Sequence, residues 1–317
     1  MFGLKSDCIL DIPEEYYTMA DYESAIARWC PGCGDHGILT AVQRLCREKQ
    51  LPPERTVFVS GIGCSSRFPH YMKTYGFHGL HGRALPVACG VKFRRPDLHV
   101  FVATGDGDCC SIGTAHWIHA IRYNMNITVM MFDNEIYGLT KGQTSPTSRP
   151  GTISNTNPHG SHLPPLNPIQ TTLGVSNASF VAQTVDWNPA HLYATVEAGF
   201  EHPGMSFIRV IQRCPVYQKD LHEPEVANPN TVTLLNHPKG IHLDEQIVKM
   251  YKNVVEHDPS NIDRARELAG MTDSIPIGLF YQDKTKPRYD DYGAHNMGMT
   301  PEDKVRAINR ELDKLAV

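Results

Sequence analysis

The sequence lacks an apolar run long enough to cross a membrane. Its longest apolar stretches, such as residues 127–132, have the length of a strand, whereas a spanning helix needs roughly 18 or more apolar residues. Residues 1–17 are acidic and contain no apolar core of a secretion signal. These absences predict a soluble, cytoplasmic protein without a membrane segment.

Clusters of Lys and Arg are also missing. The 30 basic residues are outnumbered by 34 acidic ones, and the formal net charge is −4. Nucleic-acid-binding domains usually carry a basic face, so this balance argues against nucleic acid as a partner. The chain shows no internal repeat or low-complexity tract, and its 317 residues suffice for one large domain or two.

Cysteine is not rare, but its number does not suit a disulfide framework. The nine cysteines are an odd number in a long chain without a secretion signal. Cys46 and Cys89 lie in apolar surroundings typical of small buried residues. Four others stand beside Gly or Pro at turn-like places that suit metal ligands: Cys30, Cys33, Cys64 and Cys214. The first two form a Cys-x-x-Cys pair, which is compatible with zinc, a disulfide or an iron–sulfur cluster.

Strand and helix patterns alternate through the middle of the chain. The expected strands are residues 56–60, 99–104, 127–132, 179–184 and 206–212, and the expected helices are residues 84–95, 112–124 and 189–201. Asn188 before Pro189 is a good start for the last of these helices. Continuously apolar strands that alternate with helices predict a doubly wound α/β fold with a mostly parallel sheet.

Two regions depart from this alternation. Residues 140–168 show no periodic pattern; such a long segment is usually functional, and a plain surface excursion is the alternative. After residue 217 we expect a linker. Helices are expected over residues 243–257, 261–270 and 301–315, with one strand within residues 274–295. We therefore predict a cofactor-binding domain over residues 1–225 and a small, largely helical C-terminal extension, residues 226–317, for packing or for contacts between subunits.

Polar side chains follow two neighbouring predicted strands. A Gly-Asp-Gly turn centred on Asp106 follows one strand, and Asn134 follows the next. Ligands of an open parallel sheet bind just beyond the carboxyl ends of its strands. The Asp106 carboxylate, the Asn134 amide oxygen and the backbone carbonyl of Ile136 form a donor set that suits Mg²⁺ on a diphosphate. A lone Gly-Asp-Gly is usually only a turn, but the two strand contexts favour the metal–diphosphate interpretation.

In combination, these motifs resemble a known family. Gly-Asp-Gly followed by Asn one strand–helix unit later is similar to the thiamine-diphosphate-binding motif. The accompanying motifs are WCPGCG (29–34), GIGCSS (61–66), HGRALPVACGVK (81–92), YGLTKGQTSPT (137–147) and RCP (213–215). In this order they resemble the β subunit of a 2-oxoacid:ferredoxin oxidoreductase, most closely the type that acts on 2-oxoglutarate.

The resemblance implies ligands for three cofactors. A [4Fe–4S] cluster would be held by Cys30, Cys33, Cys64 and Cys214, and Mg²⁺ by Asp106, Asn134 and Ile136. Thiamine diphosphate would contact Ile62, Gly63, Cys64, Ser65, His81, Gly82, Arg83, Ala84, Gly107, Asp108, Gly138 and Leu139. Structural zinc is an alternative for four cysteines, but zinc carries no electrons. A redox pair in the Cys-x-x-Cys motif would leave the other two cysteines without a role.

The implied reaction is the reversible oxidative decarboxylation of a 2-oxoacid with coenzyme A, with electrons leaving through one cluster to ferredoxin. His81 is the expected proton-transfer residue, in preference to His78. Lys141 stands where pyruvate-using relatives tend to carry Gly. Its charge suits the second carboxylate of 2-oxoglutarate, which predicts succinyl-CoA as the product. The alternatives are pyruvate or broad 2-oxoacid specificity, with Lys141 directed at solvent or a partner.

The sequence shows one α/β pattern and no second copy that could form a pyrimidine-binding domain with its activating Glu. The resemblance places both on an α subunit, with most of the coenzyme A site, so we expect activity only in an αβ or (αβ)2 assembly. No further Cys-rich run suggests additional clusters, and electrons would pass directly to ferredoxin. Two other interpretations are a non-oxidative thiamine decarboxylase or synthase, which needs no cluster, and a zinc-stabilised binding module without enzymatic activity.

Overall fold

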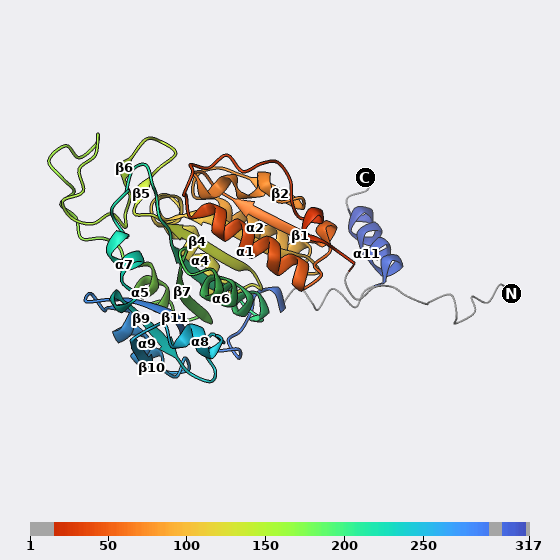
Figure 1. The fold of residues 1–317 in the computed structure, drawn as a ribbon. Helices are drawn as coiled ribbons and strands as arrows, with labels where there is room; N and C mark the ends of the chain where they lie inside the picture. Colours follow the sequence, from red (N-terminus) through yellow and green to blue (C-terminus); the bar gives the residue numbers. More distant parts are fainter. Residues whose placement is uncertain (1–15, 292–299, 315–317) are drawn as a thin grey trace.

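A nine-stranded sheet forms the centre of the computed structural model, which describes residues 16–291 and 300–314 (Figure 1). Its strands are β1 (Thr56–Ser60), β2 (Tyr75–His78), β3 (His99–Gly105), β4 (Thr128–Asp133), β7 (Phe180–Val185), β8 (Ser206–Ile211), β9 (Val232–Asn236), β10 (Asn253–Glu256) and β11 (Ile275–Gln282). The strand order is β10-β9-β11-β7-β8-β4-β3-β1-β2. The six strands that lie between one edge of this order and its middle, β2, β1, β3, β4, β8 and β7, are parallel to one another. Strand β11 is antiparallel to β7, and β9 and β10 have the same direction as β11. A small hairpin, β5 (Ile136–Tyr137) with β6 (Gln143–Thr144), stands apart from the sheet.

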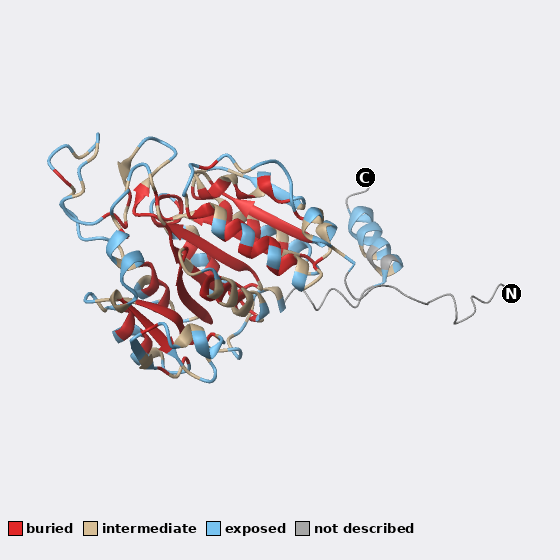
Figure 2. Ribbon diagram, viewed as in Figure 1, coloured by how far each residue is buried: buried red, intermediate tan, exposed pale blue. Residues whose placement is uncertain are grey.

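Helices cover both faces of the sheet. The longer ones are α1 (Asp35–Glu48), α2 (Ala84–Arg94), α4 (Thr114–Tyr123), α6 (Pro189–Glu201) and α9 (Ile262–Ala269); the shorter ones are α3 (Asp106–Cys110), α5 (Pro168–Leu173), α7 (Glu223–Ala227) and α8 (Glu245–Val248). Helix α11 (Pro301–Asp313) lies apart from the sheet (Figure 1). Residues of α2, α4, α5 and α9 share one apolar core with one side of the strands, and residues of α1 and α6 share another with the opposite side. Strand β1 illustrates the division, because Val57 and Val59 enter the first core and Phe58 enters the second. Figure 2 shows the central strands buried between these layers, whereas the edge strands β2 and β10 are largely exposed.

The predicted doubly wound α/β fold is confirmed, and the local signals explain why. Strands β1, β4 and β7 are buried at every position, as expected for a parallel sheet covered on both faces. Helix α6 begins as predicted, because the Asn188 side chain accepts a hydrogen bond from the His191 backbone N–H. Within the described residues, no helix is both long enough and apolar enough to span a bilayer.

The prediction was wrong in part of the C-terminal region. The expected helix over residues 243–257 ends after the four residues of α8, and the chain then enters β10. Val254 and Val255 pair with Leu234 and Leu235 of β9, a strand that the sequence suggested was linker. Pairing of β-branched residues within the sheet therefore overrides the helical pattern of this segment.

The topology gathers four loops at one edge of the sheet. Strands β1, β3, β4 and β8 are parallel and contiguous, so their carboxyl ends lie along the same edge. Cys64 follows β1, Asp106 follows β3, Asn134 follows β4 and Cys214 follows β8. Residues distant in sequence are thereby placed where ligands of open α/β sheets bind.

Candidate active site

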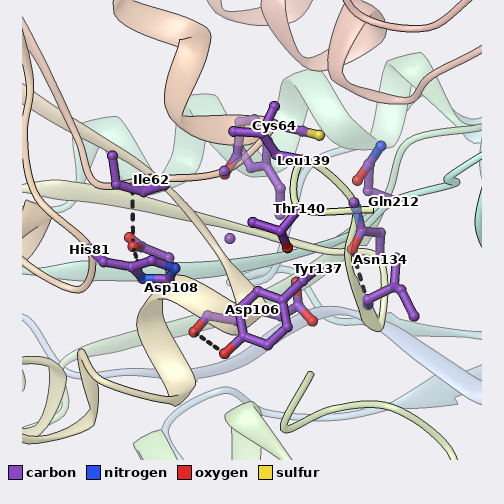
Figure 3. A pocket seen from close by; sticks show the side chains of 17 residues that line it. Ile62, Cys64, His81, Asp106, Asp108, Asn134, Tyr137, Leu139, Thr140 and Gln212 are labelled. Carbon is purple, nitrogen blue, oxygen red and sulfur yellow. Dashed lines mark hydrogen bonds and ion pairs between the residues drawn. The ribbon is translucent and has the colours of Figure 1, made fainter. Parts of the chain in front are cut away.

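A cavity lies at this edge of the sheet (Figure 3). Twelve of the residues predicted from sequence line it: Ile62, Gly63, Cys64, Ser65, His81, Asp106, Gly107, Asp108, Asn134, Ile136, Gly138 and Leu139. Three predicted cofactor contacts do not. Gly82 hydrogen-bonds to Asp108, Arg83 precedes helix α2, and Ala84 is buried in the first turn of that helix. The structure therefore brings most of the predicted cofactor and magnesium residues to one place.

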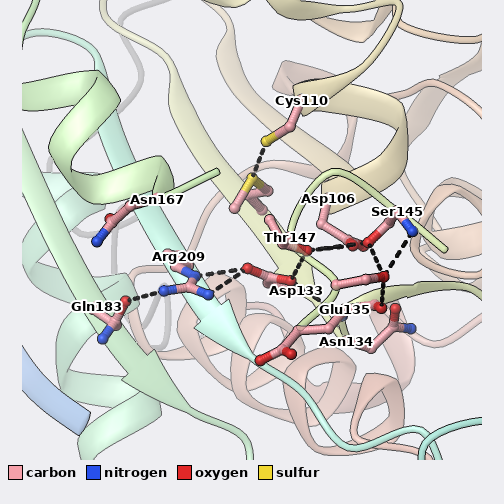
Figure 4. A network of polar contacts seen from close by, with 12 residues as sticks. Asp106, Cys110, Asp133, Asn134, Glu135, Ser145, Thr147, Asn167, Gln183 and Arg209 are labelled. Carbon is pink, nitrogen blue, oxygen red and sulfur yellow. Dashed lines mark hydrogen bonds and ion pairs between the residues drawn. The ribbon is translucent and has the colours of Figure 1, made fainter. Parts of the chain in front are cut away.

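Asp106 is a buried carboxylate without a nearby cation in the described structure. It is 2% exposed, and the Thr147 hydroxyl lies 2.8 Å from both Asp106 Oδ2 and Asp133 Oδ1 (Figure 4). Burial, and then repulsion from Asp133, raise the pKa of Asp106 well above its usual range. A single hydroxyl donates only one hydrogen, so it cannot satisfy both carboxylates. This shortage of positive charge fits a site built to receive Mg²⁺.

The other two predicted magnesium donors lie on the next loop. Asn134 is 7% exposed, and its Oδ1 accepts a hydrogen bond from the Ile136 backbone N–H at 3.2 Å. The Tyr137 hydroxyl donates to the Gly107 carbonyl at 3.0 Å and so joins this loop to the Gly-Asp-Gly turn. A Cβ at Gly107 would lie 2.1 Å from the Tyr137 ring, which explains the glycine there. The oxygen donors of Asp106, Asn134 and Ile136 thus come from two loops held against each other.

Asp108 links three segments of the cavity wall. Its Oδ1 accepts hydrogen bonds from the backbone N–H groups of Ile62, at 3.1 Å, and Gly82, at 2.7 Å, and its Oδ2 accepts from the Thr104 hydroxyl at 2.8 Å. The Nδ1 atom of His81 lies 2.8 Å from the same Oδ1. Gly61 leaves room for this arrangement, since a Cβ there would lie 2.0 Å from Asp108 Oδ2. Both carboxylate oxygens of Asp108 are therefore engaged by the chain itself.

The two histidines considered from the sequence are placed differently. His81 lines the cavity with Nδ1 against Asp108, so Nε2 is the ring nitrogen left for proton transfer (Figure 3). His78 instead places Nδ1 2.7 Å from the Ser66 carbonyl and 3.2 Å from the Ser60 hydroxyl, and it is absent from the cavity lining. The geometry favours His81 for a role in the cavity.

The four turn-placed cysteines line a second cavity: Cys30, Cys33, Cys64 and Cys214. Cys64, Asn134, Gly138 and Leu139 line both cavities, so the two are direct neighbours. A Cβ at Gly138 would lie 3.4 Å from Cys64 Sγ, which shows how closely the loops approach there. Burial raises the pKa of the Cys64 thiol to about 12, and binding of a metal would reverse that effect by deprotonating the sulfur.

The spacing of the cysteines bears on which metal they suit. Among the described residues, no three His, Cys, Asp or Glu side chains converge closely enough to hold a single metal ion. A zinc ion needs four sulfurs about 2.3 Å from one point. A [4Fe–4S] cluster distributes its four thiolates around a larger body. Four cysteines around one cavity form a donor set that either a [4Fe–4S] cluster or a zinc ion could use.

A buried ionic network behind Asp106 was not predicted. Arg209 donates to Asp133 through Nε at 2.7 Å and to Gln183 through a terminal nitrogen at 3.0 Å (Figure 4). Thr147 then connects Asp133 to Asp106. One signal was available, because Arg209 is the one charged residue of strand β8. No comparable feature of the sequence predicted that Thr147 would join this network, because Thr147 lies in the aperiodic segment, residues 140–168.

Comparisons with known proteins agree with this geometry. The family model of the thiamine pyrophosphate enzyme C-terminal TPP-binding domain matches residues 61–210, and that of the C-terminal region of the pyruvate ferredoxin oxidoreductase beta subunit matches residues 242–295. The 2-oxoglutarate oxidoreductase subunit KorB of Mycobacterium tuberculosis is 48% identical over 60% of this chain; the match spans 51% of that subunit's length. The 2-oxoacid:ferredoxin oxidoreductase subunit beta of a Sulfolobus species is 38% identical over 83% of this chain and 84% of its own length.

A solved structure extends the likeness to the whole fold. The 2-oxoglutarate:ferredoxin oxidoreductase from Magnetococcus marinus, with 2-oxoglutarate, coenzyme A and succinyl-CoA bound, superposes with a TM-score of 0.78 at 35% identity. The likeness covers 93% of this chain and 96% of that one. Together with the near full-length match to the Sulfolobus subunit, it shows that the chain belongs to the family of 2-oxoacid:ferredoxin oxidoreductase β subunits.

Proposed function

We propose that this chain is the cofactor-binding β subunit of a 2-oxoglutarate:ferredoxin oxidoreductase. In this reaction 2-oxoglutarate, coenzyme A and two oxidised ferredoxins give succinyl-CoA, CO₂, a proton and two reduced ferredoxins. Cys30, Cys33, Cys64 and Cys214 would hold a [4Fe–4S] cluster, which would supply the one-electron chemistry. The observation that carries the proposal is the shared wall of the two cavities, to which Cys64, Asn134, Gly138 and Leu139 all contribute. An electron donor in one cavity would lie directly beside an acceptor in the other.

The residues of the first cavity fit thiamine diphosphate with Mg²⁺. Asp106, Asn134 and the Ile136 carbonyl would hold the metal, and the glycines at 63, 107 and 138 would let the backbone approach the diphosphate. When bound, thiamine diphosphate supplies a carbanion and an electron sink. His81 would hold or transfer a proton at Nε2, with Asp108 fixing its orientation. Ile62 and Leu139 would exclude water from the reacting side of the cavity.

We also propose that the site is completed by an α subunit, in an αβ or (αβ)2 assembly. It would bring a pyrimidine-binding domain, the activating Glu and most of the coenzyme A site. Exposed apolar residues around the cavity support a covering partner: Leu139 lines it, and Ile112 contacts Gly82 at its margin. Residues 1–225 would form the cofactor domain, and residues 226–317 would serve packing or contacts between subunits.

The test is the metal and cofactor content of the αβ complex purified without air. We expect about four irons with matching sulfide per αβ pair, and one bound thiamine diphosphate. The complex should also reduce ferredoxin only when 2-oxoglutarate and coenzyme A are both present. Zinc in place of iron, with no thiamine diphosphate, would overturn the oxidoreductase proposal and leave a zinc-stabilised binding module.

Lys141 is proposed to select 2-oxoglutarate over pyruvate. It is exposed, lines the cysteine cavity and lies two residues after Leu139, which borders both cavities. Its backbone has a φ of +82°, a conformation that side chains rarely adopt and that glycine at this position would take without strain. Lysine at this position costs backbone strain, and a function of its positive charge would explain why lysine rather than glycine stands there.

Replacement of Lys141 by Gln should therefore raise the KM for 2-oxoglutarate about tenfold and leave the kinetics with pyruvate unchanged. The factor corresponds to loss of one charge-assisted hydrogen bond, about 1.5 kcal/mol. Lys141→Arg keeps the charge and should retain most of the selectivity. Steady-state kinetics of both variants with both acids provide the measurement. Equal losses for the two substrates would show that Lys141 does not read the second carboxylate.

A further inference from the structure

The cysteine cavity has a positively charged rim. Arg28, Arg67 and Lys141 line it, and no Asp or Glu does so. Within the described part of the chain, none of these three cations forms an ion pair with a carboxylate. The chain as a whole carries a net charge of −4, so the charge of this group of cations is opposite in sign to the net charge of the chain. We call Arg28, Arg67 and Lys141 the cationic rim.

Tyr71 holds the two arginines of the rim in place. Its hydroxyl accepts a hydrogen bond from the Arg28 backbone N–H at 3.0 Å, and the Arg67 guanidinium lies 5.8 Å from the centre of its ring. The Tyr71 ring packs edge-on against Trp29, whose Nε1 donates to the Cys64 carbonyl at 2.7 Å. The arginines are thus attached to the framework that carries the cysteines.

The same face exposes a cysteine and apolar side chains. Cys30 is the one exposed member of the four predicted cluster ligands. Val216, 54% exposed, and Leu139, 45% exposed, both line the cavity. Protein interfaces typically combine an apolar centre with a charged periphery that determines partner choice. The face around Cys30 has both components.

We propose that the two arginines of the cationic rim, Arg28 and Arg67, dock an acidic electron-carrier protein, the ferredoxin of the proposed reaction, over Cys30. This inference rests on the proposed function, since the carrier must approach the cluster that the cysteines would hold. Positive charges with no carboxylate partner attract a negatively charged protein over about one Debye length, roughly 8 Å at physiological salt. Their position around Cys30 directs the carrier to the edge of the cavity nearest the solvent.

The alternative role for the rim is to offset the negative charge of four thiolates and their cluster. The two roles predict different consequences. Charge compensation would make iron retention depend on the arginines, whereas docking would make only the reaction with the protein acceptor depend on them. The experiment therefore measures both, in the intact αβ complex.

We expect Arg28→Glu to raise the KM for an acidic ferredoxin at least tenfold at low salt and to flatten its dependence on ionic strength. Iron content and the rate with methyl viologen, a small dication, should not fall. Arg67→Gln should act in the same direction more weakly. Arg94→Glu, an exposed arginine at the far end of helix α2, is the matched control and should leave all rates unchanged.

Three results would overturn the docking proposal: an unchanged KM for ferredoxin in Arg28→Glu, equal losses with ferredoxin and methyl viologen, or loss of iron from the variant. Failure of the proposed function itself has a different signature. In that case the unmodified complex would lack iron and would reduce neither acceptor when given 2-oxoglutarate and coenzyme A. Lys141 is left intact in these variants because it is proposed to contact substrate.

Discussion

Replacement of Asp108 by Asn is expected to lower turnover about a hundredfold while leaving the subunit folded, at the lower end of the range for an impaired general acid–base residue. The reason is the position of His81, whose Nδ1 lies 2.8 Å from Asp108 Oδ1. A charged carboxylate at this position attracts the imidazole N–H more strongly than a neutral acceptor does, and so holds the ring in its orientation. An amide is neutral and holds the ring less firmly.

The folded structure should tolerate the change because Asn retains the shape of the side chain. Its carbonyl oxygen can still accept from the backbone N–H groups of Ile62 and Gly82, and its amide can donate to the Thr104 hydroxyl, which both donates and accepts. Asp108→Ala removes these contacts altogether. That variant should also lose affinity for thiamine diphosphate, because the segments that carry Ile62 and Gly82 are no longer joined.

Three measurements separate the effects: kcat, KM for the 2-oxoacid, and the affinity of the complex for thiamine diphosphate with Mg²⁺. For Asp108→Asn we expect a fall in kcat with nearly unchanged cofactor affinity. Asp97→Asn, which alters an exposed pair with Arg95, serves as the control and should be neutral. If Asp108→Asn and Asp108→Ala reduced cofactor affinity equally, the role of Asp108 would be only to join the segments that carry Ile62 and Gly82. His81 would then not depend on the charge of Asp108.

The cofactor cavity could be predicted from sequence because its residues lie next to strand ends. Asp106 and Asn134 directly follow β3 and β4, two strands that the apolar pattern located nearly to the residue. Parallel strands bring their carboxyl ends to one edge, so local signals sufficed to place these residues together. Cys64 and Cys214 were identified by their Gly and Pro neighbours and by the family resemblance. They also follow parallel strands, β1 and β8, which explains why they line the same cavity.

The supporting network could not be predicted in this way. Thr147 reaches Asp106 from a loop without a regular element, and Arg209 reaches Asp133 from the middle of β8. Which residues meet across such distances depends on how the loop folds back, and no spacing rule encodes that. The strand β10 was missed for a related reason, since its conformation depends on a pairing partner, β9, that the sequence did not suggest.

Replacement of Cys30 by Ala should abolish electron transfer to ferredoxin without disturbing the cofactor cavity. Cys30 is exposed, so the change removes no core packing, but a [4Fe–4S] cluster deprived of one thiolate is not expected to remain intact. Iron analysis of the anaerobically purified complex should show loss of most of the cluster. Thiamine diphosphate should remain bound, because Cys30 is absent from the lining of the cofactor cavity.

Cys89→Ala provides the matched control. Cys89 is a residue of helix α2 that is buried in the apolar core, and it belongs to neither cavity. Its replacement should cost about 1 kcal/mol of stability through lost packing and leave iron content and activity unchanged. Equal iron contents in the two variants would show that Cys30 is not a ligand. Loss of zinc rather than iron from Cys30→Ala would instead mean that the four cysteines form a structural site. The cavity they line could then not serve as the path by which electrons leave the cofactor cavity.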